Sequence, residues 1–289
     1  MSRSLLDLSG NIEDPRLVEI FSILTSRANE GGIHYFVVGA TARDLIFACG
    51  HGIASGRATL DIDLAIELSG WDAFHALKEA LIESGFFEPT RMVQRLIYGG
   101  SMPLDIVPFG LLEQGSGEIR WPPDEKIRMN MRGFEDAYRD AQMVRLRAKP
   151  VLDIPCASPA GLALLKIIAW NDRWPAGGKD AGDLLFLMRN FLEAGKQDDL
   201  YHCHPDLLEG EDFDFELASA RLLGRDIAKI MSDGTRGIVV QILERETSEQ
   251  GGFRLLTDMA HSLPRTDQAF EQALRLLDAL RMGVEEGGW

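Results

Sequence analysis

The chain has 289 residues, of which 45% are hydrophobic and 26% are charged, as is typical of a globular protein with one large or two modest domains. Its net charge of −15 excludes binding of nucleic acid through overall charge, so any RNA contact requires a local basic patch. Cys49, Cys156 and Cys203 fit no metal-binding spacing, and neither a signal peptide nor a membrane span is evident, so we expect a cytoplasmic protein with no membrane partner.

The first half of the chain alternates between predicted helices and strands. Asp14 is a suitable N-cap for a helix over 15–30, and the apolar segment 34–38 predicts a buried strand. Gly39-Ala40 then turns into a second helix. Next we expect a strand over 60–66, a helix from 69–72 to Gly85, strands over 95–98 and 104–109, a surface loop over 110–126, and one or two strands within 143–154. This order predicts an α/β (α+β) fold with a mixed sheet flanked by helices.

From Ser158-Pro159 onward the pattern becomes helical almost to the end. Helices are predicted near 159–173, 180–194, 215–231, 235–246 and 267–281. We place a domain boundary near residue 150. Residues 1–150 would then form the α/β core, and residues 151–289 a mainly helical C-terminal domain.

Two carboxylates, Asp61 and Asp63, interrupt the otherwise apolar strand predicted over 60–66. Residues two apart in a strand share a face, so these like charges must be neutralised or exposed at a solvated strand end. A divalent cation is the usual remedy, and hard cations held by carboxylates normally serve phosphate chemistry. Asp105 interrupts a later apolar strand. Neighbouring strands lie about 4.8 Å apart, so Asp105 could reach the same metals and deprotonate an attacking hydroxyl.

Gly39-Ala40-Thr41 stands at a predicted junction between a strand and a helix. Glycine lets a ligand approach the backbone, and amides at the start of a helix favour phosphate. Thr41 could donate its hydroxyl to a phosphate or cap the helix. Arg43 could pair with Asp44 or face a triphosphate. A plain turn with a helix cap explains the same residues.

A second group of charges lies in the helical half. Lys166 and Arg173 are seven residues apart and share a helical face, and a lone lysine in the apolar stretch around 166 needs an anion. Asp180 and Asp183 stand one turn apart on the next predicted helix and could pair with either cation. The group is either an internal clamp between two helices or part of a ligand site.

Taken together, these motifs resemble known families. Gly39-Ala40-Thr41, R-x-T-x-D-x-D over 57–63, and the later lone Asp105 resemble the polymerase-β-like nucleotidyltransferase superfamily, in which many members carry serine where Ala40 stands. The pattern K-x₆-R from Lys166, followed by K-D-x-x-D-L from residue 179, is similar to motifs of AbiEii-type toxins, including MenT-like nucleotidyltransferases. These matches span roughly residues 33–190.

The resemblance implies a role for each matching residue. Asp61 and Asp63 would bind two Mg²⁺ ions, with Mn²⁺ as an alternative, and Asp105 would be a third ligand or a base. The nucleoside triphosphate (NTP) would be held by Gly39, Ala40, Thr41, Arg43, Arg57, Lys166, Arg173 and Asp183. Lys166 would contact its phosphates, Asp183 would orient the active-site lysine or arginine, and the C-terminal domain would complete the nucleotide site.

The implied activity is a Mg-dependent transfer of a nucleoside monophosphate (NMP) from an NTP to an acceptor hydroxyl. RNA is the favoured acceptor, in particular the 3′ end of a tRNA, and the protein would be the toxin of a toxin–antitoxin pair with an antitoxin partner. Two alternatives stay open. The chain could modify a small molecule, as antibiotic nucleotidyltransferases do, or it could bind a nucleotide or a partner without catalysis.

Three further features have mainly structural interpretations. His202, Cys203 and His204 are adjacent in sequence, which favours a surface loop over a metal site. The acidic run 209–216 is typical of a solvated loop and helix start, although an antitoxin contact would also explain it. Positive charge gathers at Arg128, Arg132, Arg139, Arg145, Arg147 and Lys149. A solvated face explains this group, and an RNA-binding strip is the alternative.

Overall fold

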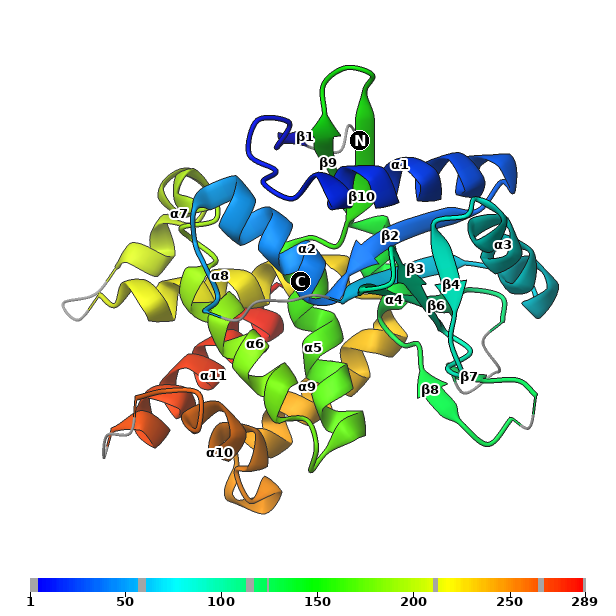
Figure 1. Ribbon diagram of the computed structural model, residues 1–289. Helices are drawn as coiled ribbons and strands as arrows, with labels where there is room; N and C mark the ends of the chain where they lie inside the picture. Colours follow the sequence, from blue (N-terminus) through cyan, green and yellow to red (C-terminus); the bar gives the residue numbers. More distant parts are fainter. Residues whose placement is uncertain are drawn as a thin grey trace. The chain divides into compact units, whose positions relative to one another are not determined.

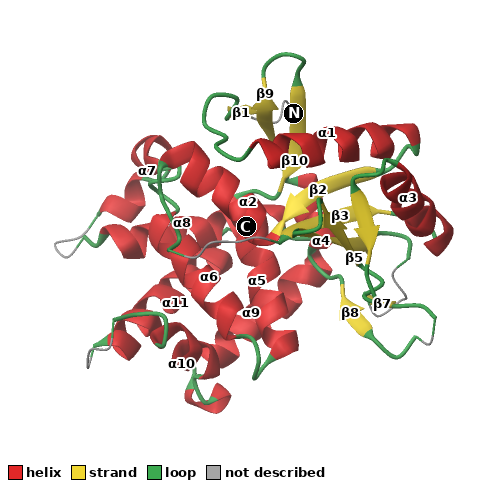
Figure 2. Cartoon of the chain, in the orientation of Figure 1, coloured by secondary structure: helices red, strands yellow, loops and turns green. Residues whose placement is uncertain are grey.

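The computed structural model describes residues 5–56, 61–112, 117–123, 125–209, 213–264 and 268–287. The chain divides into two compact units, Met1–Ser158 (unit 1) and Pro159–Trp289 (unit 2). All described strands belong to unit 1, and the described part of unit 2 is helical (Figure 2). The predicted fold class, a mixed sheet flanked by helices and followed by a helical part, is therefore confirmed. No helix among the described residues is both long and apolar enough to cross a membrane.

Unit 1 is built on a mixed sheet of eight strands in the order β1-β9-β10-β2-β3-β6-β5-β4. These strands are β1 Leu5–Asp7, β2 His34–Val38, β3 Ile62–Glu67, β4 Phe87–Pro89, β5 Arg95–Tyr98, β6 Met102–Phe109, β9 Gln142–Arg147 and β10 Leu152–Cys156. At the centre, β2 is antiparallel to β3, β3 is parallel to β6, and β6 is antiparallel to β5.

The two faces of the central strands are covered differently. On one face, Leu64, Leu96 and Leu104 are fully buried. Tyr35 and Tyr98 share that face and hydrogen-bond to Thr25 and Glu19 of α1 (Pro15–Glu30), which packs beside α3 (Trp71–Glu83).

On the opposite face, Phe36 and Phe109 pack against Tyr138 of the short helix α4 (Phe134–Arg139). Alternation along the strands places Asp63, Asp105 and Arg95 on this second face. These three residues are only partly buried, so the second face of the sheet is the more open one.

Two further elements complete unit 1. Helix α2 (Gly39–Arg43) follows β2 directly and continues into a π-helical stretch, η1 (Asp44–Gly50). A second, two-stranded sheet joins β7 (Glu118–Arg120) to β8 (Arg128–Asn130).

The prediction of a surface loop throughout 110–126 is therefore wrong in part. Ile119 of β7 is fully buried, and Trp121 packs against the rings of Trp71 and Phe74. Contacts with a distant helix thus order a segment whose glycines, prolines and charges are typical of a loop.

Unit 2 consists of helices packed around one another. They are α5 Pro159–Arg173, α6 Gly178–Asn190, α7 Gln197–Cys203, η2 Pro205–Leu208, α8 Phe215–Ile230, α9 Asp233–Glu246, η3 Glu249–Gly251, α10 Arg254–Ala260 and α11 Ala269–Glu286. Helix α8 packs along α11 (Figure 1). Their backbones meet at Gly224 and Gly283, because a Cβ atom on either glycine would overlap with the other helix.

Most predicted element bounds agree closely with the structure, and the differences are local. The helices over 15–30 and 159–173 and the strands over 34–38 and 95–98 match the predicted bounds. The strand expected over 60–66 begins at Ile62, so Asp61 immediately precedes it. The prediction missed the short elements β1, β4, α4, α7 and α10.

Candidate functional site

A row of residues crosses the central sheet of unit 1. Val38, Asp63, Asp105 and Arg95 occupy directly paired positions on β2, β3, β6 and β5. Paired residues on neighbouring strands point to the same face, so both carboxylates and the guanidinium lie together. The expectation that Asp63 and Asp105 lie on adjacent strands is confirmed. Asp61 precedes Asp63 by two residues and joins the group through Arg95.

Arg95 is the residue of this row that the sequence did not single out. Its Nε donates to Asp105 Oδ1 at 2.7 Å and its Nη2 to Asp105 Oδ2 at 2.6 Å, a bidentate pair. The same Nη2 lies 3.4 Å from Asp61 Oδ2. The hydrogen bonds to Asp105, followed by the nearby charges, raise the pKa of Arg95 above its ordinary value. Arginine at the start of an apolar strand is ordinary in sequence, and only the strand register shows its partners.

Gly39 is required by the way the first turn meets Asp63. Its φ is +65°, in the left-handed region that favours glycine. A Cβ atom at this position would overlap with Asp63 Oδ2 and would lie 2.9 Å from Asp63 Cγ. The Gly39 turn and the Asp63 carboxylate are therefore in direct contact, which places the backbone of the turn beside the acidic row.

The other predicted residues of this region have mainly structural partners. Thr41 is buried, and its hydroxyl donates to the carbonyl oxygen of Asp61 at 3.0 Å, which holds the start of the acidic strand against α2. Arg43 is buried and pairs with its neighbour Asp44, the local pairing that the sequence offered as one alternative. Ala40 is partly exposed in α2, and Arg57 lies outside the described residues.

The donors of the acidic row fit a hard divalent cation by their chemistry, because all three are carboxylates. Arg95 also shows that positive charge is accommodated between Asp61 and Asp105. Within the part of the chain that the structure describes, no three His, Cys, Asp or Glu side chains form a group that could hold a metal ion. In this structure Asp61 and Asp105 are arranged around the guanidinium.

Unit 2 contains a second charged cluster, built on α5 and α6. Lys166 Nζ lies 2.9 Å from Asp180 Oδ1 and 2.7 Å from Asp183 Oδ2, and Arg173 Nη1 lies 3.2 Å from Asp180 Oδ2. Both carboxylates are buried. Burial alone would lower the pKa of Lys166, but the two carboxylates outweigh it and the pKa lies above its ordinary value. Lys166 is therefore a charged, fixed cation, and Asp180 is a partner that the predicted site did not include.

The remaining charged segments have local partners. Arg139 pairs with Glu135 and Arg145 with Asp153, which reduces the net positive charge of the basic group. In the acidic run, Asp214 caps α8 by accepting from the backbone of Glu216 and Leu217. His202 and Cys203 lie on the exposed last turn of α7 and not in a loop as expected, because the helix extends to Cys203.

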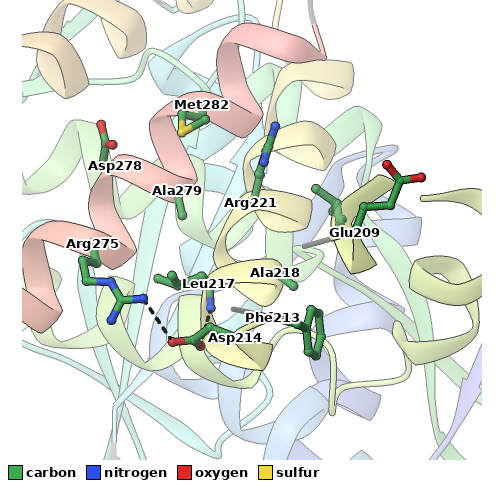
Figure 3. A pocket seen from close by; sticks show the side chains of 11 residues that line it. Glu209, Phe213, Asp214, Leu217, Ala218, Arg221, Arg275, Asp278, Ala279 and Met282 are labelled. Carbon is green, nitrogen blue, oxygen red and sulfur yellow. Dashed lines mark hydrogen bonds and ion pairs between the residues drawn. The ribbon is translucent and has the colours of Figure 1, made fainter. Parts of the chain in front are cut away.

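A hollow of about 330 Å³ opens beside α8 and α11 in unit 2 (Figure 3). Its lining combines apolar side chains, among them Phe213 and Met282, with the ion pair between Arg275 and Asp214. The sequence gave no signal for it, because its residues come from segments that are distant along the chain.

Comparison with known proteins identifies the family of this chain. Residues 23–274 match the model of the AbiEii family, described as the nucleotidyl transferase AbiEii toxin of type IV toxin–antitoxin systems. No curated protein sequence matches.

Similar solved structures include an antigenic nucleotidyltransferase-like protein from Paracoccidioides brasiliensis (17% identity, 66% of this chain and 90% of that chain, TM-score 0.40). Others are the antibiotic-resistance factor ANT(2'')-Ia (14%, 68% and 96%, TM-score 0.36) and a CCA-adding enzyme with ATP (17%, 90% and 66%, TM-score 0.32). These likenesses are too slight to carry an argument. The family match, in contrast, spans most of the sequence, and this chain belongs to the AbiEii nucleotidyltransferases.

Proposed function

We propose that this nucleotidyltransferase moves an NMP from an NTP to a hydroxyl of RNA, with the 3′ end of a tRNA favoured, and that the reaction depends on Mg²⁺. The observation that carries the proposal is the pairing of Asp63 with Asp105 on one sheet face, with the Gly39 turn against Asp63. Carboxylates gathered beside an exposed backbone turn are suited to phosphate chemistry.

The acidic row would hold the metal ions. Asp61 and Asp63 are proposed as ligands, and Asp105 as a third ligand or as the base that removes the proton of the acceptor hydroxyl. Bound Mg²⁺ would supply charge stabilisation to the acceptor oxygen and to the leaving pyrophosphate. Gly39 and Ala40 would let the backbone approach the triphosphate, while Thr41 keeps Asp61 in place through its backbone carbonyl.

The charged cluster of unit 2 is proposed to bind the phosphates of the NTP. Lys166 would contact them directly, and the paired carboxylates Asp180 and Asp183 would orient its ammonium group. Arg173 is more exposed than Lys166, so it has greater freedom to turn from Asp180 toward an anion. Ammonium and guanidinium groups are the usual partners of phosphate oxygens.

The family description also supports a biological role as a toxin. We propose that the protein acts in the cytoplasm and that an antitoxin opposes it. A toxin that modifies tRNA ends would block aminoacylation, and this explains why an RNA acceptor is preferred here over a small molecule.

The test is a transfer assay with each labelled NTP, Mg²⁺ and total RNA. We expect label to enter RNA with the wild type, to be lost with Asp63→Ala, and to require an NTP concentration at least about tenfold higher with Lys166→Met. Glu67→Ala is the matched control, because Glu67 lies at the exposed far end of the same strand, where it pairs with His34. Labelling should be unchanged in Glu67→Ala.

Each outcome bears on a separate part of the proposal. Labelling that survives Asp63→Ala would refute the role of the acidic row. Label that appears in a small molecule of a cell extract, but in no RNA, would move the assignment to an antibiotic-type nucleotidyltransferase. Binding of an NTP without transfer to any acceptor would leave only a nucleotide-binding module.

A further inference from the structure

Arg95 combines a firm contact with a loose one. Its bidentate pair with Asp105 has bonds of 2.6 and 2.7 Å, whereas its Nη2 lies 3.4 Å from Asp61 Oδ2. Burial differs in the same direction, because 16% of the Asp105 side chain is exposed but 48% of the Asp61 side chain. Arg95 is therefore anchored at Asp105, and its contact with Asp61 is the one that can open.

The position of Nη2 conflicts with a metal ion shared by these two acids. A cation that binds both Oδ2 atoms must lie about 2.0–2.6 Å from each of them. That space lies between the two carboxylates, where Nη2 now stands within hydrogen-bonding distance of both oxygens. The guanidinium and the metal also carry the same sign of charge, so both cannot occupy this position.

We propose that Arg95 is an exchangeable counterion of the acidic row. It neutralises Asp61 and Asp105 when no divalent cation is bound, and it releases Asp61 when a cation binds there. Its bond to Asp105 persists, so it acts as a positioning residue for that carboxylate. This inference rests on the proposed function only in taking Asp61 as a metal ligand, and it assigns the step that controls access to that ligand.

The proposal predicts that loss of Arg95 strengthens metal binding. The test uses the full-length, nucleotide-free protein and measures free Mn²⁺ by electron paramagnetic resonance during titration. We expect the Kd for Mn²⁺ to fall at least about fivefold in Arg95→Met, because a competing unit charge at close range is removed. Arg91→Met is the matched control, since Arg91 is exposed, lies four residues earlier and removes the same charge. Its Kd should stay at the wild-type value.

A second readout follows the metal-free state. In EDTA, Arg95→Met should melt at a lower temperature than Arg91→Met, because three carboxylates lose their counterion. Added Mn²⁺ should close most of that gap, since the metal replaces the lost charge. Where Arg95→Met does not fold, Arg95→Gln takes its place, because glutamine keeps a donor for Asp105 without the charge.

Adding Asp61→Asn separates competition from a general change in the site. In that background, Arg95→Met should change the affinity for Mn²⁺ much less, because the contested ligand is gone. An unchanged or weaker affinity in the Arg95 variants, while Asp61→Asn still lowers the affinity of the wild type, would overturn the exchange and leave the proposed function intact. If neither the wild type nor the Arg95 variants bind Mn²⁺, both the inference and the metal-dependent function fail.

Discussion

At Gly39 a side chain is excluded for two independent reasons, and each has a measurable cost. The backbone has a φ of +65°, and a Cβ atom would overlap with the carboxylate of Asp63. Gly32 has nearly the same φ, +63°, but nothing lies within 4 Å of the position of its Cβ. The two glycines therefore separate backbone strain from displacement of the acid.

We expect Gly32→Ala to lower the free energy of unfolding by about 1–2 kcal/mol, the cost of a left-handed alanine, and to leave transfer activity unchanged. Gly39→Ala should cost more than that and should also abolish transfer, because Asp63 has to move. Urea unfolding and the RNA-labelling assay measure the two effects. Equal stability costs for both variants, with full activity in Gly39→Ala, would show that Asp63 has no required position.

Residue types and spacing could predict the acids of the site, but not their surroundings. Asp61, Asp63 and Asp105 stand out because a charge within an apolar strand has a high desolvation cost. The guanidinium that meets two of them belongs to Arg95, whose partners depend on the pairing of β5 with β6. Register between strands is a tertiary property, so no local pattern singles out Arg95.

The helices α8 and α11 illustrate how an element contact depends on the lack of side chains. Gly224 lies so close to α11 that a Cβ atom would overlap with the carbonyl oxygen of Leu280 and would lie 2.9 Å from the amide nitrogen of Val284. Backbone atoms cannot move aside as a flexible side chain can. The two helices would therefore have to separate to accept even a methyl group.

We expect Gly224→Ala to lower the free energy of unfolding by about 1–3 kcal/mol, the usual cost of overpacking. The control is Gly237→Ala in α9, where nothing lies within 4 Å of the Cβ position and the residue is exposed. That change should raise stability by up to about 1 kcal/mol, since alanine favours a helix over glycine. Urea denaturation compares both variants with the wild type. Stabilisation by Gly224→Ala would contradict the close packing of these helices.

Prediction of elements succeeded where the chain carries local stop and start signals. Helix α1 begins after Asp14, whose side chain accepts from the backbone of Arg16 as an N-cap, and Gly31 follows its last residue. The hairpin of β7 and β8 was missed because its order comes from burial of Ile119 and Trp121 against distant residues. Short helices such as α7 and α10 were missed because a few residues carry little periodicity.

For the whole molecule, the net charge of −15 leads to a simple expectation about acid that the ion pairs reverse. Self-repulsion alone would make partial protonation stabilising. Yet several carboxyl groups of unit 2 have pKa values below their ordinary range. Burial acts to raise the pKa of Glu286, but the guanidinium groups of Arg221 and Arg225 outweigh it. The hydrogen bond from Arg225 lowers the pKa of Asp206 in the same way.

Groups with a depressed pKa in the folded state stabilise it above their unfolded pKa, near 3.8 for Asp206 and 4.5 for Glu286. That stability is lost as the pH falls through the lower, folded values. We therefore expect the free energy of unfolding to be nearly constant from pH 7 to about 5.5 and to decrease below about pH 4.5. Urea unfolding followed by circular dichroism at pH 7, 5, 4 and 3 measures this dependence.

Replacement of Glu286 identifies the source of that acid dependence. Glu286→Gln should cost about 1–2 kcal/mol at pH 7, because Arg221 and Arg225 lose a charged partner, and the cost should shrink toward pH 3 as the wild-type carboxylate becomes protonated. Glu285→Gln is the control, since Glu285 forms an exposed pair with Arg281 within the same helix, and such pairs contribute little. A cost that stays constant from pH 7 to 3 would show that Glu286 stabilises α11 through packing and not through its charge.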